Sequence, residues 1–216
     1  MKIFMAGVGG MLGEAFYQVF TEKGYEIQCS DIDVNESWLQ HLDFRNYDAY
    51  RSAVIKFNPD YIFHIGAYTS LEFCELNPLD TYSTNTLSVE HAVTLANELD
   101  IPMLYISTAG IFDGEKSLYD DWDLPNPLGV YARSKFMGER YVVENARRYY
   151  ICRAGWMMGG GPGKDKKYIS KIMKQIKNGV SVLNVVDDRD GTPTYTLDFA
   201  ATCEALVRTD YYGLYN

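Results

Sequence analysis

The sequence predicts an α/β protein with a doubly wound parallel sheet and a small C-terminal lobe, and three observations support this fold class. Short apolar runs of strand length alternate along the chain with longer segments of helical periodicity. A glycine-rich turn directly follows the first apolar run, and turn-forming residues separate the later elements. The 216 residues are 47% hydrophobic, which is enough to bury one core and a smaller attached lobe.

Five apolar runs predict the strands of the sheet. Each run is followed by a segment long enough for a helix, and strands that are joined through helices pair in parallel. The runs are KIFMAG at 2–7, YEIQCS at 25–30, YIFHIG at 61–66, MLYIST at 103–108 and YYICRAG at 149–155.

Helices are predicted between these runs. In MLGEAFYQVFTEK, at 11–23, the apolar residues share one helical face, and Gly24 ends the helix. The segment 80–100 is also predicted to be helical. Turn residues at 58–60 (NPD) precede the third strand, and those at 123–129 (DLPNPLG) precede the helix that contains YARSK. The apolar face of the first helix consists of Leu12, Phe16, Val19 and Phe20.

The alternation weakens after Gly155, so we predict two units. Residues 1–155 form the sheet domain, and residues 156–216 form a partial second lobe with a segment that returns to the first domain. The basic segment 163–177 is predicted to be a helix with its lysines toward solvent and its apolar residues buried. Alternatively, its lysines contribute to binding a substrate phosphate. The apolar residues are Ile169, Ile172, Met173 and Ile176.

The composition argues against several classes of partner. The formal charge of −9 disfavours nucleic acid and anionic membrane surfaces, because both are polyanions. No apolar stretch approaches the length that spans a bilayer, and the first strand is too short for a signal sequence, so we expect a cytoplasmic protein. The cysteines form no C-x-x-C pattern, and the three histidines add no zinc-ligand spacing. We therefore expect no metal site, and buried thiols at Cys29, Cys74, Cys152 and Cys203.

The glycine-rich turn AGVGGMLG predicts a dinucleotide site. It places Gly7, Gly10 and Gly13 in the spacing G-x-x-G-x-x-G between the first strand and the first helix. The first glycine permits a tight turn, the second lets the backbone approach a pyrophosphate, and the third lets helix and strand pack closely. The helix N-terminus then directs unpaired N–H groups at the phosphates. The sheet is thus Rossmann-like with NAD(H) or NADP(H) as cofactor, and Met11 and Leu12 are expected to contact it. A turn without a ligand is the alternative.

Acidic residues after the second strand bear on the choice of cofactor. Asp31 lies about 20 residues beyond the glycine motif, where a carboxylate accepts the two hydroxyl protons of the adenosine ribose. Its charge would oppose a 2′-phosphate, which favours NAD over NADP. Asp33 is an alternative for this role, and either aspartate could instead cap a loop. Asp43 and Phe44 lie where a loop could cover the adenine, although an aspartate at 43 is also typical of a turn.

The sequence YARSK places a tyrosine and a lysine one helical turn apart, at Tyr131 and Lys135. With 18 tyrosines in the chain, roughly one such spacing is expected by chance, so the pair needs support from its surroundings. Thr108 ends the fourth predicted strand, at the sheet edge where α/β folds bind ligands. We expect the three side chains to converge beside a nicotinamide. There Thr108 would bind a carbonyl oxygen, Tyr131 would donate a proton to it, and Lys135 would lower the pKa of Tyr131.

Together these motifs resemble a known family. The glycine turn, STAGIFDG at 107–114 and YARSK are similar to the extended short-chain dehydrogenase/reductase superfamily, and most similar to dTDP-4-dehydrorhamnose reductases. The resemblance implies NAD(P)H-dependent reduction of a nucleotide-linked 4-keto sugar in deoxysugar and surface polysaccharide synthesis. Four further stretches extend it over nearly the whole chain: HIGAYTSLEFCELNP, NTLSVEHAVTLANE, CRAGWMMGGG and GTPTYTLDFA.

The resemblance also implies roles for individual residues. Thr108, Tyr131 and Lys135 match the catalytic trio of the family, and Asn85 matches its helical asparagine. Thr108 and Trp156 are expected to contact the sugar, although a tryptophan at 156 is also typical of packing between lobes. The GAYT stretch is expected to line the cofactor through Gly66, Ala67 and Tyr68.

Two departures from the family pattern leave alternatives. Ala109 and Gly110 stand where family reductases usually carry Asp-Tyr, so one substrate contact is missing, and the lack of an Asp-Glu pair there argues against a dehydratase. The chain is also shorter than its relatives, so we expect either a reduced substrate lobe or a chain that continues. The alternatives to a reductase are a non-catalytic NAD(P)-binding regulatory subunit and a sugar-nucleotide epimerase. A homodimer is left open.

Overall fold

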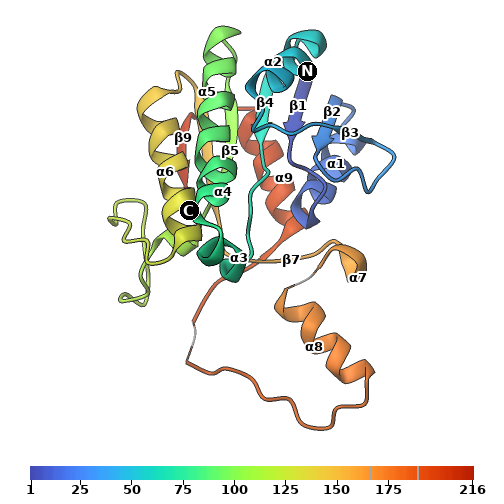
Figure 1. Ribbon diagram of the computed structural model, residues 1–216, viewed down its shortest axis with the longest axis vertical. Coiled ribbons are helices and arrows are strands. Elements are labelled where there is room, and N and C mark those ends of the chain that lie inside the picture. The colour runs from blue at the N-terminus through green and yellow to red at the C-terminus, as the bar shows by residue number, and fades with distance from the viewer. Residues whose placement is uncertain (166, 189) are drawn as a thin grey trace.

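The main sheet is the framework of the molecule. The structure is a computed structural model that describes residues 1–165, 167–188 and 190–216. In this part of the chain, seven parallel strands pair in the order β3-β2-β1-β4-β5-β6-β9 (Figure 1). The order reverses at β1, so the predicted doubly wound α/β fold is confirmed. The strands are β1 (Lys2–Ala6), β2 (Glu26–Asp31), β3 (Leu39–His41), β4 (Tyr61–His64), β5 (Met103–Thr108), β6 (Tyr149–Ala154) and β9 (Gly213–Tyr215).

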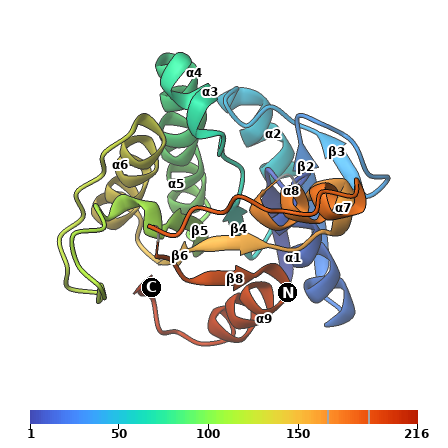
Figure 2. The same ribbon diagram turned by 90° about the horizontal axis from the view of Figure 1, so that it is seen from below.

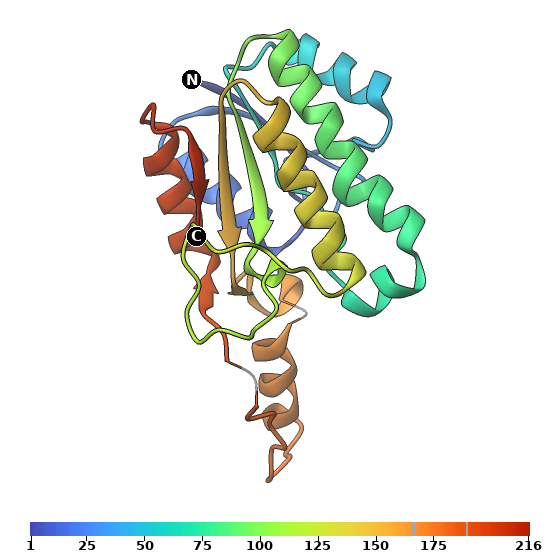
Figure 3. The same ribbon diagram turned by 90° about the vertical axis from the view of Figure 1, so that its left-hand side faces the viewer.

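Helices cover both faces of the sheet. One face packs against α1 (Met11–Glu22) and α9 (Thr196–Val207), and the other against three helices (Figure 3). In α1, the rings of Phe16 and Phe20 stack at 5.6 Å and both meet Phe63 of β4, which confirms the predicted apolar face. The three helices of the other face are α2 (Tyr47–Phe57), α5 (Ser88–Glu98) and α6 (Val130–Asn145).

All five predicted strands are present, and the shortest elements were missed. The apolar runs form β1, β2, β4, β5 and β6. In the main sheet, the missed strands β3 and β9 have three residues each, which is too short for a periodic pattern to indicate a strand.

The predicted helical segment 80–100 contains a local irregularity. It forms α4 (Pro78–Tyr82), a π-helical turn η1 (Ser83–Leu87) and then α5. Asn85 lies in this π turn with its side chain fully buried. Such turns often accompany functional sites, and no periodicity in the sequence indicates one. A short helix, α3 (Leu71–Leu76), precedes α4, and Ser70 caps it by accepting a hydrogen bond from the Phe73 N–H.

The chain leaves the main sheet after β6 and rejoins it at α9 and β9. Between them, β7 (Trp156–Met158) and β8 (Pro193–Tyr195) form a separate parallel pair, and Figure 2 shows β8 beside α9. The short helix α7 (Gly161–Lys164) follows β7. The division into domains at residue 155 stays a prediction.

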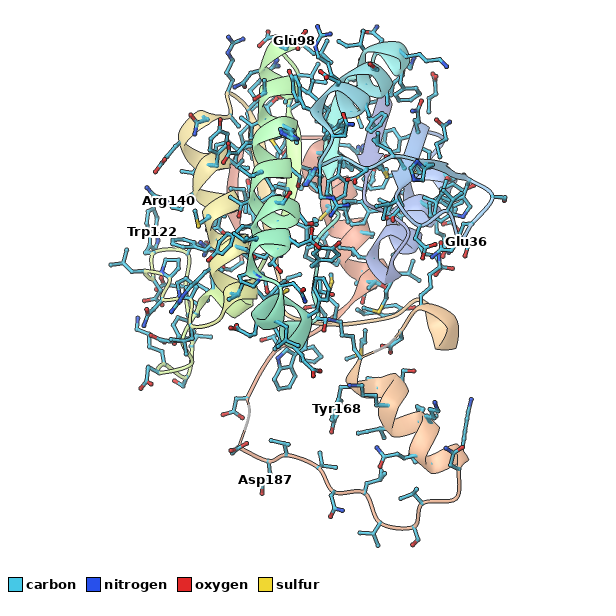
Figure 4. The ribbon with its side chains drawn as sticks, viewed as in Figure 1. Glu36, Glu98, Trp122, Arg140, Tyr168 and Asp187 are labelled. Atoms are coloured by element: carbon cyan, nitrogen blue, oxygen red, sulfur yellow. The ribbon has the colours of Figure 1, made fainter. Side chains whose placement is uncertain are left out.

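The basic segment forms a helix, but its apolar face is not buried as predicted. Helix α8 (Tyr168–Lys177) leads into an irregular stretch, and together residues 168–188 form an arm that extends away from the sheet (Figure 1). Figure 4 shows Tyr168 and Asp187 on this arm. Amphipathic periodicity shows which side of a helix is apolar, but it does not show that a partner covers that side. Lys166 of the basic segment lies outside the described residues. The exposed fractions are 41% for Ile169, 47% for Met173 and 50% for Ile176, while Ile172 is half-buried.

Two further predictions concern the whole chain. All four cysteines are free and buried, as predicted. In the part of the chain that the structure describes, no helix combines the length and apolar character that crossing a membrane requires.

Candidate active site

Three loops meet at the carboxyl edge of the sheet beside β1, where the strand order reverses. Gly7 follows β1, Asp31 ends β2, and Gly66 follows β4. The Gly7 N–H donates to the Ser30 carbonyl at 2.8 Å, and the Gly66 N–H donates to the Ala6 carbonyl at 3.1 Å. These bonds bring together the predicted cofactor-binding stretches at the position where doubly wound folds bind ligands.

The glycine turn contains two kinds of glycine. A Cβ at Gly7, whose φ is +77°, would lie 2.1 Å from the Gly66 Cα, and a Cβ at Gly13 would lie 2.1 Å from the Val8 carbonyl oxygen. Packing therefore requires both of these glycines. A Cβ at Gly10 would have no described atom within 4 Å, so this residue borders open space.

The open side of the turn fits a dinucleotide phosphate. Gly10 is the N-cap of α1 and supplies no side chain to the first N–H groups of the helix, which an anion can bind. Met11 and Leu12 begin the helix and are half-buried. The turn thus has the shape and the donors that a pyrophosphate needs.

Asp31 is fixed against the glycine turn. Its Oδ2 accepts the Gly9 N–H at 2.8 Å, and its Oδ1 accepts the Asp33 N–H at 2.9 Å. A Cβ at Gly9 would lie 2.9 Å from the Asp31 Cγ, so Gly9, which was not predicted, is also required. The adjacent glycines GG were the available signal. Asn35 Nδ2 donates to the Gly9 carbonyl at 3.1 Å and holds the turn from its other side.

Asp43 and Phe44 have different surroundings. The Phe44 ring packs on the backbone of Gly66, where an added Cβ would lie 2.5 Å from the Phe44 Cε1. Asp43 accepts hydrogen bonds from the Arg45 guanidinium, with Nη2 to Oδ2 at 2.7 Å, and these bonds hold the pKa of its carboxyl below the ordinary value. It also accepts the Arg45 N–H at 3.0 Å, which is the turn geometry considered as the alternative.

Asn85 connects the two parts of the site. Its Oδ1 accepts the Tyr68 N–H at 2.8 Å, and its Nδ2 donates to the Tyr68 carbonyl at 3.0 Å and to Ser134 Oγ at 3.0 Å. Ser134 lies on α6 between Tyr131 and Lys135. The π turn therefore ties the loop that contains Gly66, Ala67 and Tyr68 to the helix that carries YARSK.

Thr108, Tyr131 and Lys135 converge at the ends of β5 and α6. Thr108 Oγ1 accepts the Gly110 N–H at 3.1 Å, and the Tyr131 side chain lies close enough to Thr108 for Thr108 to lower the pKa of Tyr131. Lys135 is 3% exposed, and its Nζ lies 4.2 Å from the centre of the Tyr105 ring. Such a contact stabilises a cation that has lost its water.

The pKa of Tyr131 shifts in the direction opposite to the one predicted. Burial raises it, and Thr108 opposes the rise only in part. The predicted lowering of this pKa by Lys135 is not found, because burial raises the pKa and Lys135 is not among the groups that shift it. Lys135 is itself affected, since burial lowers its pKa to about 7 and the nearby Glu139 carboxylate opposes that fall. Tyr131 thus stays protonated at neutral pH, as a proton donor must.

Two further contacts lie at the start of α6 and at the start of β7. Glu75, from α3, caps α6 by accepting the Val130 N–H at 2.6 Å. This contact was not predicted, because the two residues are 55 positions apart. Trp156 begins β7, two residues beyond Ala154, which pairs with Thr108 in the sheet. Its side chain is 55% exposed and packs on the backbone of Gly191.

The comparisons with known proteins assign the family. Residues 1–215 match the model of the RmlD substrate binding domain. The chain belongs to this family. The family resemblance predicted from the motifs is confirmed by a dTDP-4-dehydrorhamnose reductase of Aggregatibacter actinomycetemcomitans, which is 30% identical over 100% of the chain and 72% of the relative.

Two other relatives of this RmlD-family chain bear on its function. A crystal structure of dTDP-4-dehydrorhamnose reductase from Bacillus anthracis in complex with NADP is 26% identical, with a TM-score of 0.87, over 100% of the chain and 74% of that structure. Methionine adenosyltransferase 2 subunit beta of Danio rerio is 26% identical over 95% of the chain and 63% of the relative. The chain thus spans between two thirds and three quarters of the length of the two reductases, and less of the third relative.

The departure from the reductase pattern lies directly at the site of this RmlD-family chain. Ala109 and Gly110 form the turn η2 (Ala109–Ile111), and both are exposed. A Cβ at Gly110 would lie 3.3 Å from Thr108 Oγ1 and 4.0 Å from Tyr131 Cε1. A side chain at Gly110 would therefore crowd the hydroxyl of Thr108 and contact the ring of Tyr131.

Proposed function

We propose that the protein is an NAD(P)H-dependent reductase of a nucleotide-linked 4-keto sugar, in deoxysugar synthesis for surface polysaccharide. The observation that carries the proposal is the convergence of the Thr108 and Tyr131 side chains at the carboxyl edge of the sheet, with Lys135 buried one turn away on α6. Membership in the RmlD substrate binding domain family supports it, as does the relative named dTDP-4-dehydrorhamnose reductase.

Each residue has a defined part in this reaction. The bound nicotinamide supplies the hydride. Thr108 donates a hydrogen bond to the carbonyl oxygen, and Tyr131, which its raised pKa keeps protonated, transfers its O–H proton to the same oxygen. A hydride at carbon and a proton at oxygen convert the ketone into an alcohol, and Tyr131 regains its proton from solvent. Lys135 in its charged form would hold the nicotinamide ribose through its ammonium group.

The proposal includes the cofactor contacts and the setting. The pyrophosphate would be held by Gly7, Gly10, Met11, Leu12 and Gly13. Asp31 would bind the adenosine ribose, and its negative charge favours NADH. Trp156 would border the sugar. The cofactor site would be completed by Asp43, Phe44, Gly66, Ala67, Tyr68 and Asn85. Four buried free thiols support a cytoplasmic location. The proposal also includes a homodimer, for which analytical ultracentrifugation would give twice the mass of a single chain.

A second candidate function is a non-catalytic NAD(P)-binding regulatory subunit. Two observations favour it: the Danio rerio relative is named as a subunit of another enzyme, and Ala109 with Gly110 replaces the family's Asp-Tyr pair. Under this function Tyr131 would have no reaction to serve, although the cofactor would still bind.

An assay separates the two functions. The purified chain is incubated with NADH or NADPH and a panel of nucleotide-linked 4-keto sugars, and we expect cofactor oxidation that depends on the sugar. Tyr131→Phe removes only a hydroxyl, so turnover should fall about 10²–10⁴-fold with cofactor affinity unchanged. Tyr141→Phe, on the same helix, is the matched control and should retain parental turnover. A parent that binds the cofactor but never oxidises it would support the regulatory subunit, and parental turnover in Tyr131→Phe would contradict the role of Tyr131.

A further inference from the structure

A buried ion pair lies between α6 and the ends of β5 and β6. Arg153 of β6 donates to the Glu139 carboxylate through Nη2 at 2.6 Å and through Nε at 3.1 Å. Ser107 Oγ donates to the same carboxylate at 2.6 Å. The side chains of Glu139 and Arg153 are 2% and 4% exposed, so the pair is held away from water. Ser107 directly precedes Thr108, so the carboxylate is attached to the strand that carries the threonine.

The register of α6 on β5 places Lys135 beside this carboxylate. Lys135 and Glu139 lie one helical turn apart and therefore share a face of α6. They meet Tyr105 and Ser107, which lie two residues apart and therefore share a face of β5. Lys135 Nζ covers the Tyr105 ring at 4.2 Å, and Glu139 accepts the Ser107 hydroxyl. The Tyr105 hydroxyl also donates to the Lys135 carbonyl at 3.1 Å, which fixes the helix on the strand.

We propose that Glu139 is a positioning residue that keeps the Lys135 ammonium charged, and that Arg153 limits how strongly it does so. The catalytic consequence of this role of Glu139 rests on the proposed reductase function. The effect of Glu139 on the charge of Lys135 does not rest on it.

The surroundings of Lys135 show why an anion is needed there. The groups that face it are the Tyr105 ring, Tyr131, His64 of β4 and Glu139. Burial lowers the pKa of His64 to about 3, with Lys135 contributing, so His64 is neutral. Burial raises the pKa values of both tyrosines, so they are neutral as well. Among these groups Glu139 alone supplies a negative charge, and a buried ammonium without one loses its proton.

Arg153 reduces the influence of this negative charge. A carboxylate that already has a bidentate guanidinium partner attracts a second cation less strongly, and the guanidinium itself repels Lys135. Removal of Glu139 and removal of Arg153 should therefore change the protonation of Lys135 in opposite directions. A purely structural ion pair predicts no such opposition.

The test measures the pKa of Lys135 directly, in the protein without cofactor. Lysine labelled with ¹³C at Cε and ¹⁵N at Nζ is titrated by NMR, and Lys135→Met assigns the signal. We expect a pKa near 7 in the parent. Glu139→Gln should lower it by about 1 pH unit or more, and Arg153→Met should raise it by a similar amount. Glu144→Gln is the matched control, because Glu144 lies on the same helix and pairs with the exposed Arg140, and it should leave the pKa unchanged.

The outcomes are distinct even where a variant folds poorly. Glu139→Asp keeps the charge and should keep the parental pKa more closely than Glu139→Gln does. Thermal melting identifies any variant that is unfolded. If Arg153→Met is unfolded, the comparison of Glu139→Gln with Glu139→Asp decides the question. An unmoved Lys135 pKa in folded Glu139→Gln, or shifts of the same sign in Glu139→Gln and Arg153→Met, would overturn the proposal.

Activity provides a second, separable readout. If the protein is a reductase, the basic limb of its kcat profile should move to lower pH in Glu139→Gln and to higher pH in Arg153→Met. If the parent shows no turnover, the proposed function fails while the NMR titration still tests the role of Glu139.

Discussion

The glycine-turn half and the catalytic half of the site are built in different ways. Around Gly7 and Gly13, backbone segments approach so closely that a single Cβ would lie 2.1 Å from a neighbouring backbone atom. Around Lys135, in contrast, buried charged side chains occupy the space between α6 and β5, with the carboxylate of Glu139 shared between Arg153 and Ser107. The glycine-turn half depends on residues that have no Cβ atom, and the catalytic half depends on a balance of charges. Changes in the first should act through steric overlap, and changes in the second should depend on pH.

The largest expected effect tests the steric half. Gly13→Ala places a Cβ 2.1 Å from the Val8 carbonyl oxygen and 2.3 Å from the Val8 Cα. Both are backbone atoms of the turn between β1 and α1, so the helix must move away from this turn. We expect a loss of about 3 kcal/mol or more in the free energy of unfolding, at the upper end of overpacking effects. Urea unfolding followed by circular dichroism measures it.

Gly10→Ala is the matched control for this substitution. Its Cβ would have no described atom within 4 Å, so stability should change by less than about 1 kcal/mol, the usual range for an N-cap change. The affinity for NADH should nevertheless fall, because the methyl group enters the space that a pyrophosphate would occupy. If both variants lose the same stability, or if Gly10→Ala binds NADH as tightly as the parent, this view of the glycine turn is wrong.

The two halves also differ in how far the sequence could predict them. Gly7, Gly10 and Gly13 follow a strand and open a helix at fixed spacing, so their positions could be inferred from a short segment. Gly9 was missed, because the motif does not include it and its contact with Asp31 depends on how β2 pairs with β1.

The catalytic half could be predicted only for the residues that share a local pattern. The helical spacing places Tyr131 and Lys135 on one face. The partners that hold them come from elsewhere: Arg153 reaches Glu139 from the next strand, and Glu75 caps α6 from 55 positions away. Such contacts depend on strand order and helix register, which single-sequence periodicity does not contain. The arm at 168–188 shows the same limit, because its periodicity indicated a helix but not whether the apolar face is covered.

An intermediate effect tests whether the glycine-turn half contains one decisive charge. Asp31 accepts N–H groups from Gly9 and Asp33, which fix its carboxylate at the end of β2. We predict that NADH binds more tightly than NADPH by about 1–3 kcal/mol at low salt, because the 2′-phosphate would face this negative charge. Isothermal titration calorimetry with both cofactors measures the difference.

Two substitutions examine the origin of that preference. Asp31→Asn should narrow the difference between the cofactors, whereas Asp33→Asn, at the exposed competing position, should leave it unchanged. Equal dissociation constants for NADH and NADPH in the parent would refute the assignment, and a narrowing in Asp33→Asn alone would transfer the role to Asp33.

The effect that is smallest per pH unit is a pH dependence of stability that belongs to the catalytic half alone. Burial lowers the pKa of Lys135 to about 7, from about 10.5 for an ordinary lysine. Between these two values the unfolded chain binds more protons at this residue than the folded chain does, so the contribution of Lys135 to stability rises with pH. Below the lower value the full penalty of burying the charge is present. The rise from this one group is at most about 1.4 kcal/mol per pH unit.

Lys135→Met isolates this contribution, because it keeps an unbranched side chain and removes the titrating group. The difference in unfolding free energy between parent and variant should be constant well below pH 7 and should then change in favour of the parent as the pH rises. Lys171→Met, at an exposed lysine of α8, should show no such change, and neither should Gly10→Ala in the other half. Urea unfolding at a series of pH values measures all four proteins. A difference that stays flat through this window would mean that Lys135 titrates as an ordinary surface lysine. The catalytic half would then have no charge balance to distinguish it from the glycine turn.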